Sequence, residues 1–193
     1  MTAVSLLTAD VAAAVLTCPV VAIAASTRRS VAQAVVAAAI WISVSIGLVA
    51  GAGLDLRSVL VAHLVLVSAA LASAGIGRAM RAVLVDSLDA IALALCLSLG
   101  ASIGLFAMGR FAAELPPAAL NGMLAANPLV ATMSAARIDI FHNDLLYRVS
   151  PVAHLLFDYP SWQVSTALFV IVASASFAIA RWSPRRTLLR RAS

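Results

Sequence analysis

The sequence predicts an all-α protein, a polytopic transmembrane helical bundle with about five spans and a helical outer segment. The first observation behind this prediction is a series of charge-poor runs of 17, 25, 20, 20 and 22 residues, at 11–27, 30–54, 58–77, 90–109 and 159–180. A helix rises about 1.5 Å per residue and needs about 20 apolar residues to cross a hydrocarbon layer about 30 Å thick. The second is composition: 63% of the residues are hydrophobic and 11% are charged, with a mean hydropathy of +1.05, whereas soluble domains carry about 25% charged residues. Residues 1–193 are therefore expected to form a single transmembrane domain.

The first run is the shortest, and Asp10 and Pro19 interrupt the apolar sequence around it. Its marginal length leaves two interpretations open for residues 1–25: a true span, or a re-entrant or interfacial helix.

The second and fourth runs each contain a GxxxG pair, Gly47–Gly51 and Gly100–Gly104. Such pairs let two helix backbones approach closely. Tight packing within this chain is the favoured interpretation, and a dedicated dimer seam is the other.

One connection is long, the 51 residues of 110–160. Its charge-free stretch 115–136 could be mistaken for a span, but prolines and asparagines argue against a straight helix there: Pro116, Pro117, Asn121, Asn127 and Pro128. Two short helices, 118–126 and 129–136, broken at Asn127–Pro128, fit better. We expect a re-entrant helical hairpin that caps the outer face of the bundle, since broken helices are tolerated where protein or water satisfies the backbone.

The arginines predict the topology. With five spans, nine arginines fall on one side of the membrane and four on the other: Arg28, Arg29, Arg78, Arg81, Arg181, Arg185, Arg186, Arg190 and Arg191 against Arg57, Arg110, Arg137 and Arg148. Basic residues are retained in the cytoplasm, so the turns 26–30 and 78–83 and the basic tail 182–193 are predicted to be cytoplasmic, and the N-terminus, the turn 53–57 and the segment 110–160 outside. The chain is then a multi-pass protein of a bacterial inner membrane. Its tail is expected to touch membrane lipid and not nucleic acid.

Two acids, Asp86 and Asp89, lie about one helical turn apart at the start of the fourth span. They could form an intramembrane polar site for an ion or a proton. They could instead cap the helix N-terminus and pair with nearby arginines, which is the favoured interpretation because acids are common at helix starts. Asp10 has the same two interpretations. His63, within the third span, is expected to make a polar contact between helices, and His142 and His154 are expected outside.

The chain is not expected to be an enzyme. All 13 of its basic residues are arginine, so it cannot contain a P-loop of the GxxxxGK[ST] type, and any ATP hydrolysis must occur on another chain. No His, Cys and Asp cluster has metal-ligand spacing, and no Ser–His–Asp arrangement stands out. Catalytic residues, a metal and a cofactor are therefore not expected.

Several segments resemble the membrane subunit of type-2 ABC exporters: Ser26–Ser30, Ala70–Arg81, Asn127–Val130, Ser150–Leu155, Tyr159–Trp162 with the final span, and the arginine-rich end. The likeness covers about residues 26–190, and the chain looks shortened at its N-terminus, where that family usually has a further span and a coupling helix. Leu16–Val20 is similar to the family's coupling segment, which would make the first run a non-spanning element. The resemblance implies a permease that works with a separate ATPase.

The sequence therefore predicts a non-catalytic permease subunit of an ABC-type exporter, with an ATPase chain and a second permease subunit as expected partners. Arg28, Arg29, Arg78 and Arg81 are the residues expected to face the ATPase. The alternative is a structural or accessory subunit of a larger inner-membrane complex, such as a respiratory one.

Overall fold

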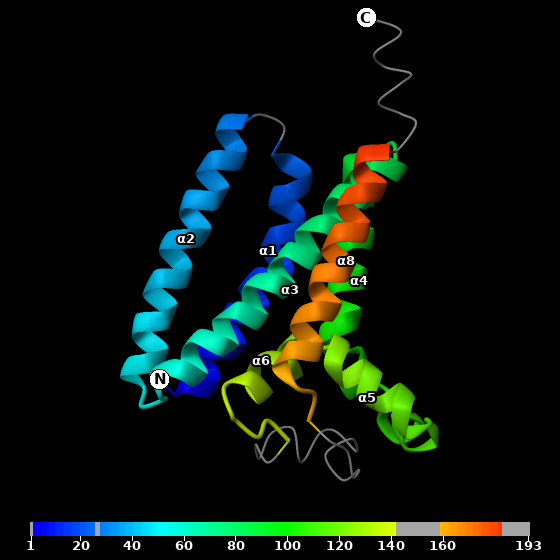
Figure 1. The fold of residues 1–193 in the computed structure, drawn as a ribbon. Coiled ribbons are helices and arrows are strands. Elements are labelled where there is room, and N and C mark those ends of the chain that lie inside the picture. Colours follow the sequence, from blue (N-terminus) through cyan, green and yellow to red (C-terminus); the bar gives the residue numbers. More distant parts are fainter. Residues whose placement is uncertain (1, 26–27, 142–158, 183–193) are drawn as a thin grey trace, which may run out of the picture.

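The chain is all-helical in the residues that the computed structural model describes, 2–25, 28–141 and 159–182. Its helices are α1 (Ala3–Ala24), α2 (Arg28–Gly51), α3 (Leu56–Val83), α4 (Ser87–Ala107), the 3₁₀ helix η1 (Gly109–Glu114), α5 (Pro117–Ala126), α6 (Pro128–Ala135) and α8 (Trp162–Trp182). Five of them, α1 to α4 and α8, are long and apolar enough to cross a membrane. The predicted fold class is confirmed (Figure 1).

The first run forms one uninterrupted helix of 22 residues that passes through both Asp10 and Pro19. Thr2 caps it by accepting the amide of Ser5. Proline is tolerated within membrane helices because neighbouring helices and local adjustments satisfy the freed backbone groups. The length and apolarity of α1 therefore favour a span over an interfacial helix. Leu16–Val20, which resembled a coupling segment, lies within this helix.

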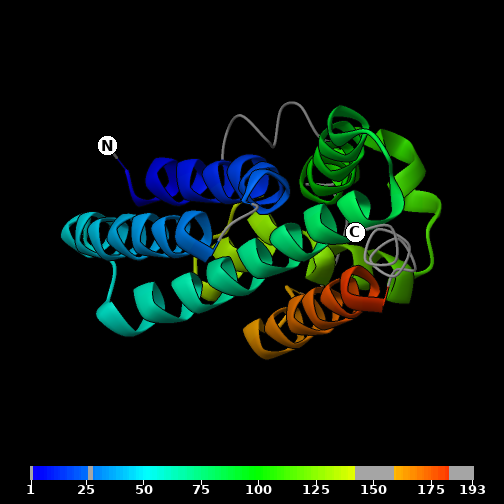
Figure 2. The same cartoon turned by 90° about the horizontal axis from the view of Figure 1, so that it is seen from above.

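The central helix is α3, which packs against α1, α2, α4, α6 and α8. It crosses the molecule diagonally, with α2 beside its first part and α8 on its other side (Figures 1 and 2). Asp55 caps its start by accepting the amide of Ser58. Hydrogen bonding with the Ser58 side chain, and then with its backbone amide, lowers the pKa of Asp55. Gly53, with a φ of 96°, completes the turn before it. The predicted turn at 53–57 is confirmed for residues 53–55, and α3 begins at Leu56.

Close helix approaches occur at glycines that the sequence reading did not single out. A Cβ on Gly77 would lie 2.6 Å from the Pro19 carbonyl oxygen on α1, and a Cβ on Gly75 would lie 3.1 Å from the Ser176 Cβ on α8. By contrast, a Cβ on any glycine of the two GxxxG pairs would meet nothing within 4 Å. The prediction that those pairs pack within the chain is wrong, because the glycines lie on helix faces turned away from the bundle.

The predicted break at Asn127–Pro128 is confirmed, with α5 and α6 on either side of it. Asn127 is fully buried, and its side-chain oxygen accepts the amides of Leu129 and Val130 at 3.0 and 3.1 Å. Its amide nitrogen donates to the Ser102 carbonyl on α4 at 2.8 Å. The side chain therefore starts α6 and fixes it to a span at the same time. In Figure 1, α5 and α6 lie at the end of the bundle opposite the C-terminus.

The end of α3 differs from the prediction. Residues 78–83 were predicted to form a turn, but α3 continues to Val83 and the connection is confined to the residues before Ser87. Arginine is a good helix former and its long side chain can reach past an apolar layer, so a helix need not end where its apolar run ends. Residues 26–27 of the other predicted turn lie outside the described residues.

Candidate functional site

Three polar side chains meet inside the bundle although they come from three different helices. Asp10 lies seven residues after the start of α1, His63 seven residues after the start of α3, and Ser45 six residues before the end of α2. At about 1.5 Å per residue, each lies about 10 Å from its helix end. Because α2 runs antiparallel to α1 and α3, these ends lie at the same side of the molecule (Figure 1), so the three side chains are level.

Hydrogen bonds join this group, which we call the Asp10–Ser45–His63 cluster. Ser45 Oγ donates to Asp10 Oδ2 and lies 3.0 Å from His63 Nε2. The other oxygen, Asp10 Oδ1, accepts from Trp41 Nε1 at 3.0 Å, and His63 Nδ1 lies 2.8 Å from the Val59 carbonyl oxygen. Each carboxylate oxygen and each ring nitrogen therefore has a partner.

The cluster is nearly sealed from the surroundings. The exposed fractions are 4% for Asp10, 6% for Ser45 and 3% for His63. Buried polar groups in an apolar medium are costly unless they are paired, and ionisable residues within membrane helices are functional-site candidates by default. The predicted interhelical contact of His63 is confirmed, and Asp10 is neither a helix cap nor an arginine partner.

The order of the three groups excludes the usual hydrolytic arrangement. In a Ser–His–Asp triad the histidine lies between the serine and the carboxylate, whereas here the serine lies between the carboxylate and the histidine. The described residues also contain no group of three His, Cys, Asp or Glu side chains that could hold a metal ion. The carboxyl group of Asp10 and the imidazole of His63 are both able to bind protons.

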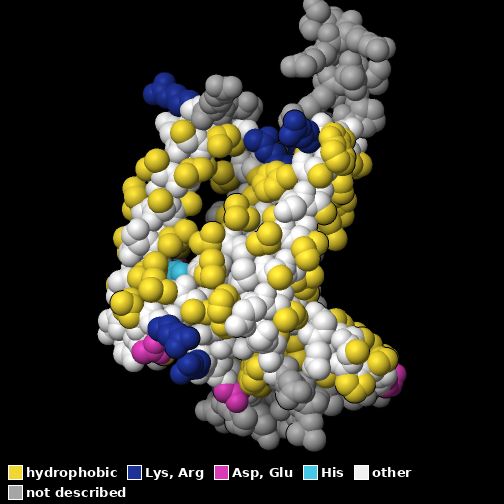
Figure 3. Space-filling view, viewed as in Figure 1, with side chains coloured by type: hydrophobic (Ala, Val, Ile, Leu, Met, Phe, Trp, Pro, Cys, Tyr) yellow, Lys and Arg dark blue, Asp and Glu magenta, His cyan; other side chains and the backbone are white. Residues whose placement is uncertain are grey.

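Helix α2 packs against the bundle at the end where this cluster lies. From Arg29 to Val44, α2 has no buried side chain, and its buried residues are Ser45 and Val49. Figure 3 shows the resulting hollow between α2 and the rest of the bundle, with a histidine side chain near its foot.

The acids predicted as alternatives do not form an intramembrane site. Asp86 is exposed and caps α4 by accepting the Leu88 amide at 2.6 Å, and Asp89 is exposed in the first turn of that helix. The favoured capping role is confirmed for Asp86. These acids were also expected to pair with nearby arginines. Instead, Arg81 Nη1 donates to the Leu84 and Val85 carbonyls at 3.4 and 3.2 Å.

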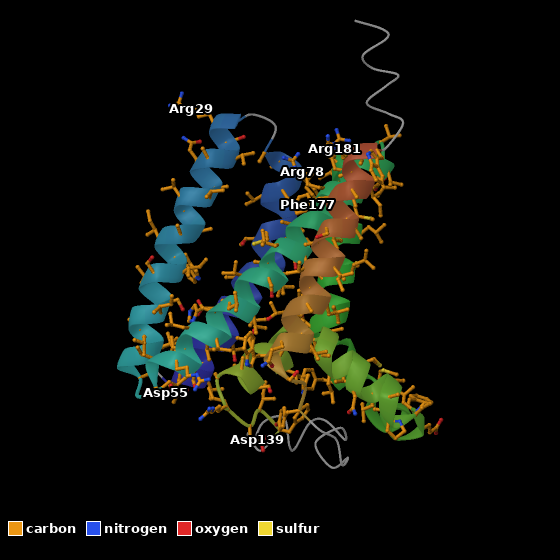
Figure 4. The ribbon with its side chains drawn as sticks, viewed as in Figure 1. Arg29, Asp55, Arg78, Asp139, Phe177 and Arg181 are labelled. Carbon is orange, nitrogen blue, oxygen red and sulfur yellow. The ribbon has the colours of Figure 1, made fainter. Side chains whose placement is uncertain are left out.

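The arginines expected to face an ATPase gather at one end of the bundle, where Figure 4 labels Arg29, Arg78 and Arg181. They differ in what they do there. Arg78 is partly buried, and its Nη2 donates to the Ala25 carbonyl at 3.1 Å, which ties the end of α1 to α3. Arg29 and Arg181 are exposed. Arg28 begins α2, but its side chain lies outside the described residues, as do the arginines beyond Trp182.

At the opposite end Figure 4 labels Asp55 and Asp139. There the chain leaving α6 meets the chain that begins α8. Tyr159 Oη donates to Asp139 Oδ1, and Ser134 Oγ donates to the Pro160 carbonyl at 3.0 Å. Burial, and then the bond to Asp139, raise the pKa of Tyr159, so it remains a neutral donor. His142 and His154, predicted outside, lie beyond the described residues.

Comparisons with protein-family models, with curated proteins and with solved structures find no match to this chain.

Proposed function

We propose that this chain is a non-catalytic permease subunit of an ABC-type exporter in a bacterial inner membrane, working with a separate ATPase chain. The observation that carries the proposal is the interrupted helix pair α5–α6, with the fully buried Asn127 at its break. Within a membrane, non-helical backbone persists only where protein or a water-filled cavity surrounds it. Interrupted helices in transporters commonly lie beside the substrate site.

The distribution of charge supports an ATPase at one end. Exposed arginines, Arg29 and Arg181, lie at the end of the bundle where α1 and α3 also end. Basic residues at one side of a membrane protein favour a cytoplasmic position. This end, the C-terminus included, is therefore proposed to be cytoplasmic and to contact the ATPase.

A second permease subunit is also part of the proposal. The apolar surface of α2 is largely unpaired within this chain, with Val35, Ile40 and Val44 each more than half exposed. Because α3 is surrounded by five helices of this chain, we place the transport path at an interface between two subunits. The alternative function is that of an accessory subunit of a larger complex. The chains that co-purify with this protein distinguish it from the permease function.

Orientation is tested with single cysteines in a background lacking the native Cys18 and Cys96. A membrane-impermeant thiol reagent applied to intact cells should label Glu114→Cys and leave Arg29→Cys unlabelled, because each replaced side chain is exposed and they lie at opposite ends. Permeabilised cells, in which both positions should react, provide the control. If intact cells label Arg29→Cys and not Glu114→Cys, the chain has the opposite orientation to the one proposed.

Association with the ATPase is tested by charge reversal at the exposed arginines. The double variant Arg29→Glu/Arg181→Glu should reduce the nucleotide-binding chain recovered after purification in mild detergent by about tenfold, equivalent to about 1.4 kcal/mol. Arg78 and Arg81 are left intact because their guanidinium groups bind backbone carbonyls. Arg57→Glu, at the opposite end, is the matched control and should retain the partner. Recovery of redox subunits alone with the unaltered chain would support the accessory role instead.

A further inference from the structure

The Asp10–Ser45–His63 cluster contains one hydrogen more than a bare carboxylate, a serine and a neutral histidine provide. A carbonyl oxygen only accepts, so the contact with Val59 places a hydrogen on His63 Nδ1. A neutral ring then has no hydrogen on Nε2. Ser45 Oγ makes two hydrogen bonds, to Asp10 Oδ2 and to His63 Nε2, but has a single hydrogen to donate.

The second hydrogen must come from one of the two neighbours. In one form Asp10 is a carboxylic acid that donates to Ser45 Oγ, and Ser45 donates to a neutral His63. In the other form Asp10 is a carboxylate that accepts from Ser45, and His63 is an imidazolium that donates through Nε2. Both forms have no net charge, which suits a site buried in an apolar medium. The forms interconvert when the acid proton moves from Oδ2 to Oγ as the serine proton moves from Oγ to Nε2.

From this count we propose that Asp10, Ser45 and His63 form an intramembrane proton-binding site that holds one proton and, while it is bound, fastens α2 to α1 and α3. Loss of the proton leaves a carboxylate, a neutral histidine and one hydrogen for two contacts. One contact is then broken, and a net negative charge remains in the bundle. Because Ser45 and Val49 are the buried residues of α2, this loosens the end of α2 that is attached.

No other charged group of the described residues is placed to supply the missing hydrogen. On α1, Asp10 is the only charged side chain, and the arginines of α2 stand at its other end. The segment of α6 has no ionisable side chain. Arg57 is exposed and lies six residues before His63, about 9 Å along the α3 axis, and Asp55 and Arg137 are exposed beyond it. The proton therefore belongs to the cluster.

A hollow lies beside α2, close to the cluster. Trp41, which donates to Asp10, is 53% exposed, so the cluster is separated from the surroundings by little more than one side chain. Figure 3 shows a histidine side chain near the foot of this hollow.

The full-length chain in detergent or lipid, labelled with nitrogen-15 in histidine, tests the proposal. The two ring-nitrogen resonances of His63, identified by their loss in His63→Gln, should shift with pH within the pH range over which the chain stays folded. In the same range the fluorescence of Trp41, in a Trp162→Phe/Trp182→Phe background, should change with the same midpoint. Amide exchange in residues 42–51 should rise at least about tenfold above that midpoint, because α2 is then less firmly attached.

Variants separate proton binding from a merely structural contact. Asp10→Asn should remove the shared midpoint, since an amide cannot release the proton, whereas Asp86→Asn, at an exposed cap, should leave it unchanged. The result that overturns the proposal comes from the unaltered chain, so it does not depend on folding of a variant. It is a His63 ring whose resonances stay constant over that pH range, or one that titrates with no change in Trp41 fluorescence.

Discussion

Gly77→Ala should destabilise the chain by about 3 kcal/mol, near the upper end of what overpacking usually costs. The added Cβ would lie 2.6 Å from the Pro19 carbonyl oxygen and 2.9 Å from its Cα. Both atoms belong to the α1 backbone, so no rotamer change can relieve the contact, and α1 must move away from α3. The measurement is the free energy of unfolding in detergent micelles, followed by circular dichroism.

Gly100→Ala is the matched control, because its Cβ would meet nothing within 4 Å. Alanine is a better helix former than glycine, so this variant should be stabilised by up to about 1 kcal/mol. Equal effects of the two substitutions would contradict the close approach of α1 and α3.

Asn127→Ala should cost about 2 to 4 kcal/mol and release α6 from α4. The substitution removes the acceptor for the Leu129 and Val130 amides and the donor to the Ser102 carbonyl. Loss of a helix cap costs about 1 kcal/mol, and leaving buried amides without a partner adds a penalty of about 1 to 3 kcal/mol. The free energy of unfolding, together with amide exchange in α6, measures both consequences.

Two further variants divide this effect into its parts. Asn127→Ser keeps a capping oxygen but loses the amide donor, so its cost should be intermediate. Asn121→Ala removes the same side chain from an exposed position on α5 and should be nearly neutral. An Asn127→Ala variant as stable as Asn121→Ala would show that the break is not fixed by this side chain.

Local chemistry made most of the fold predictable. An apolar run about 20 residues long can satisfy its backbone in a membrane only as a helix, and this is why five spans follow from the positions of charged residues alone. The break at Asn127–Pro128 was predictable for a similar reason, since proline disfavours a helical residue before it and asparagine is a good N-cap. The alternation of arginines predicted which helix ends share a side, and Figure 4 shows Arg29, Arg78 and Arg181 together.

The predictions that were wrong concern where a helix stops and which face it presents. The turn at 78–83 was placed by charge, but arginines continue α3 and use their guanidinium groups to bind carbonyls at the ends of α1 and α3. The GxxxG pairs were expected to pack, but spacing alone cannot say whether a glycine face is turned inward. Gly77, by contrast, is turned inward, against the Pro19 backbone of α1. The tilt and rotation of α3 decide this, and neither can be read from spacing.

The amino-acid sequence alone was enough to predict a bundle of apolar helices with one broken helix pair, because the hydrogen bonds of a helix close within a few residues and the signals that start, stop or break it are local. The meeting of Asp10, Ser45 and His63 is visible only in the folded chain. Their partnership spans 53 residues of sequence, from 10 to 63, and it depends on how far each helix is turned about its axis. Counting from the helix ends would have placed the three side chains at one depth, but the helix starts that this count requires, Ala3 and Leu56, came from the structure. Rotation and depth are set by packing against neighbours, which a single sequence does not contain.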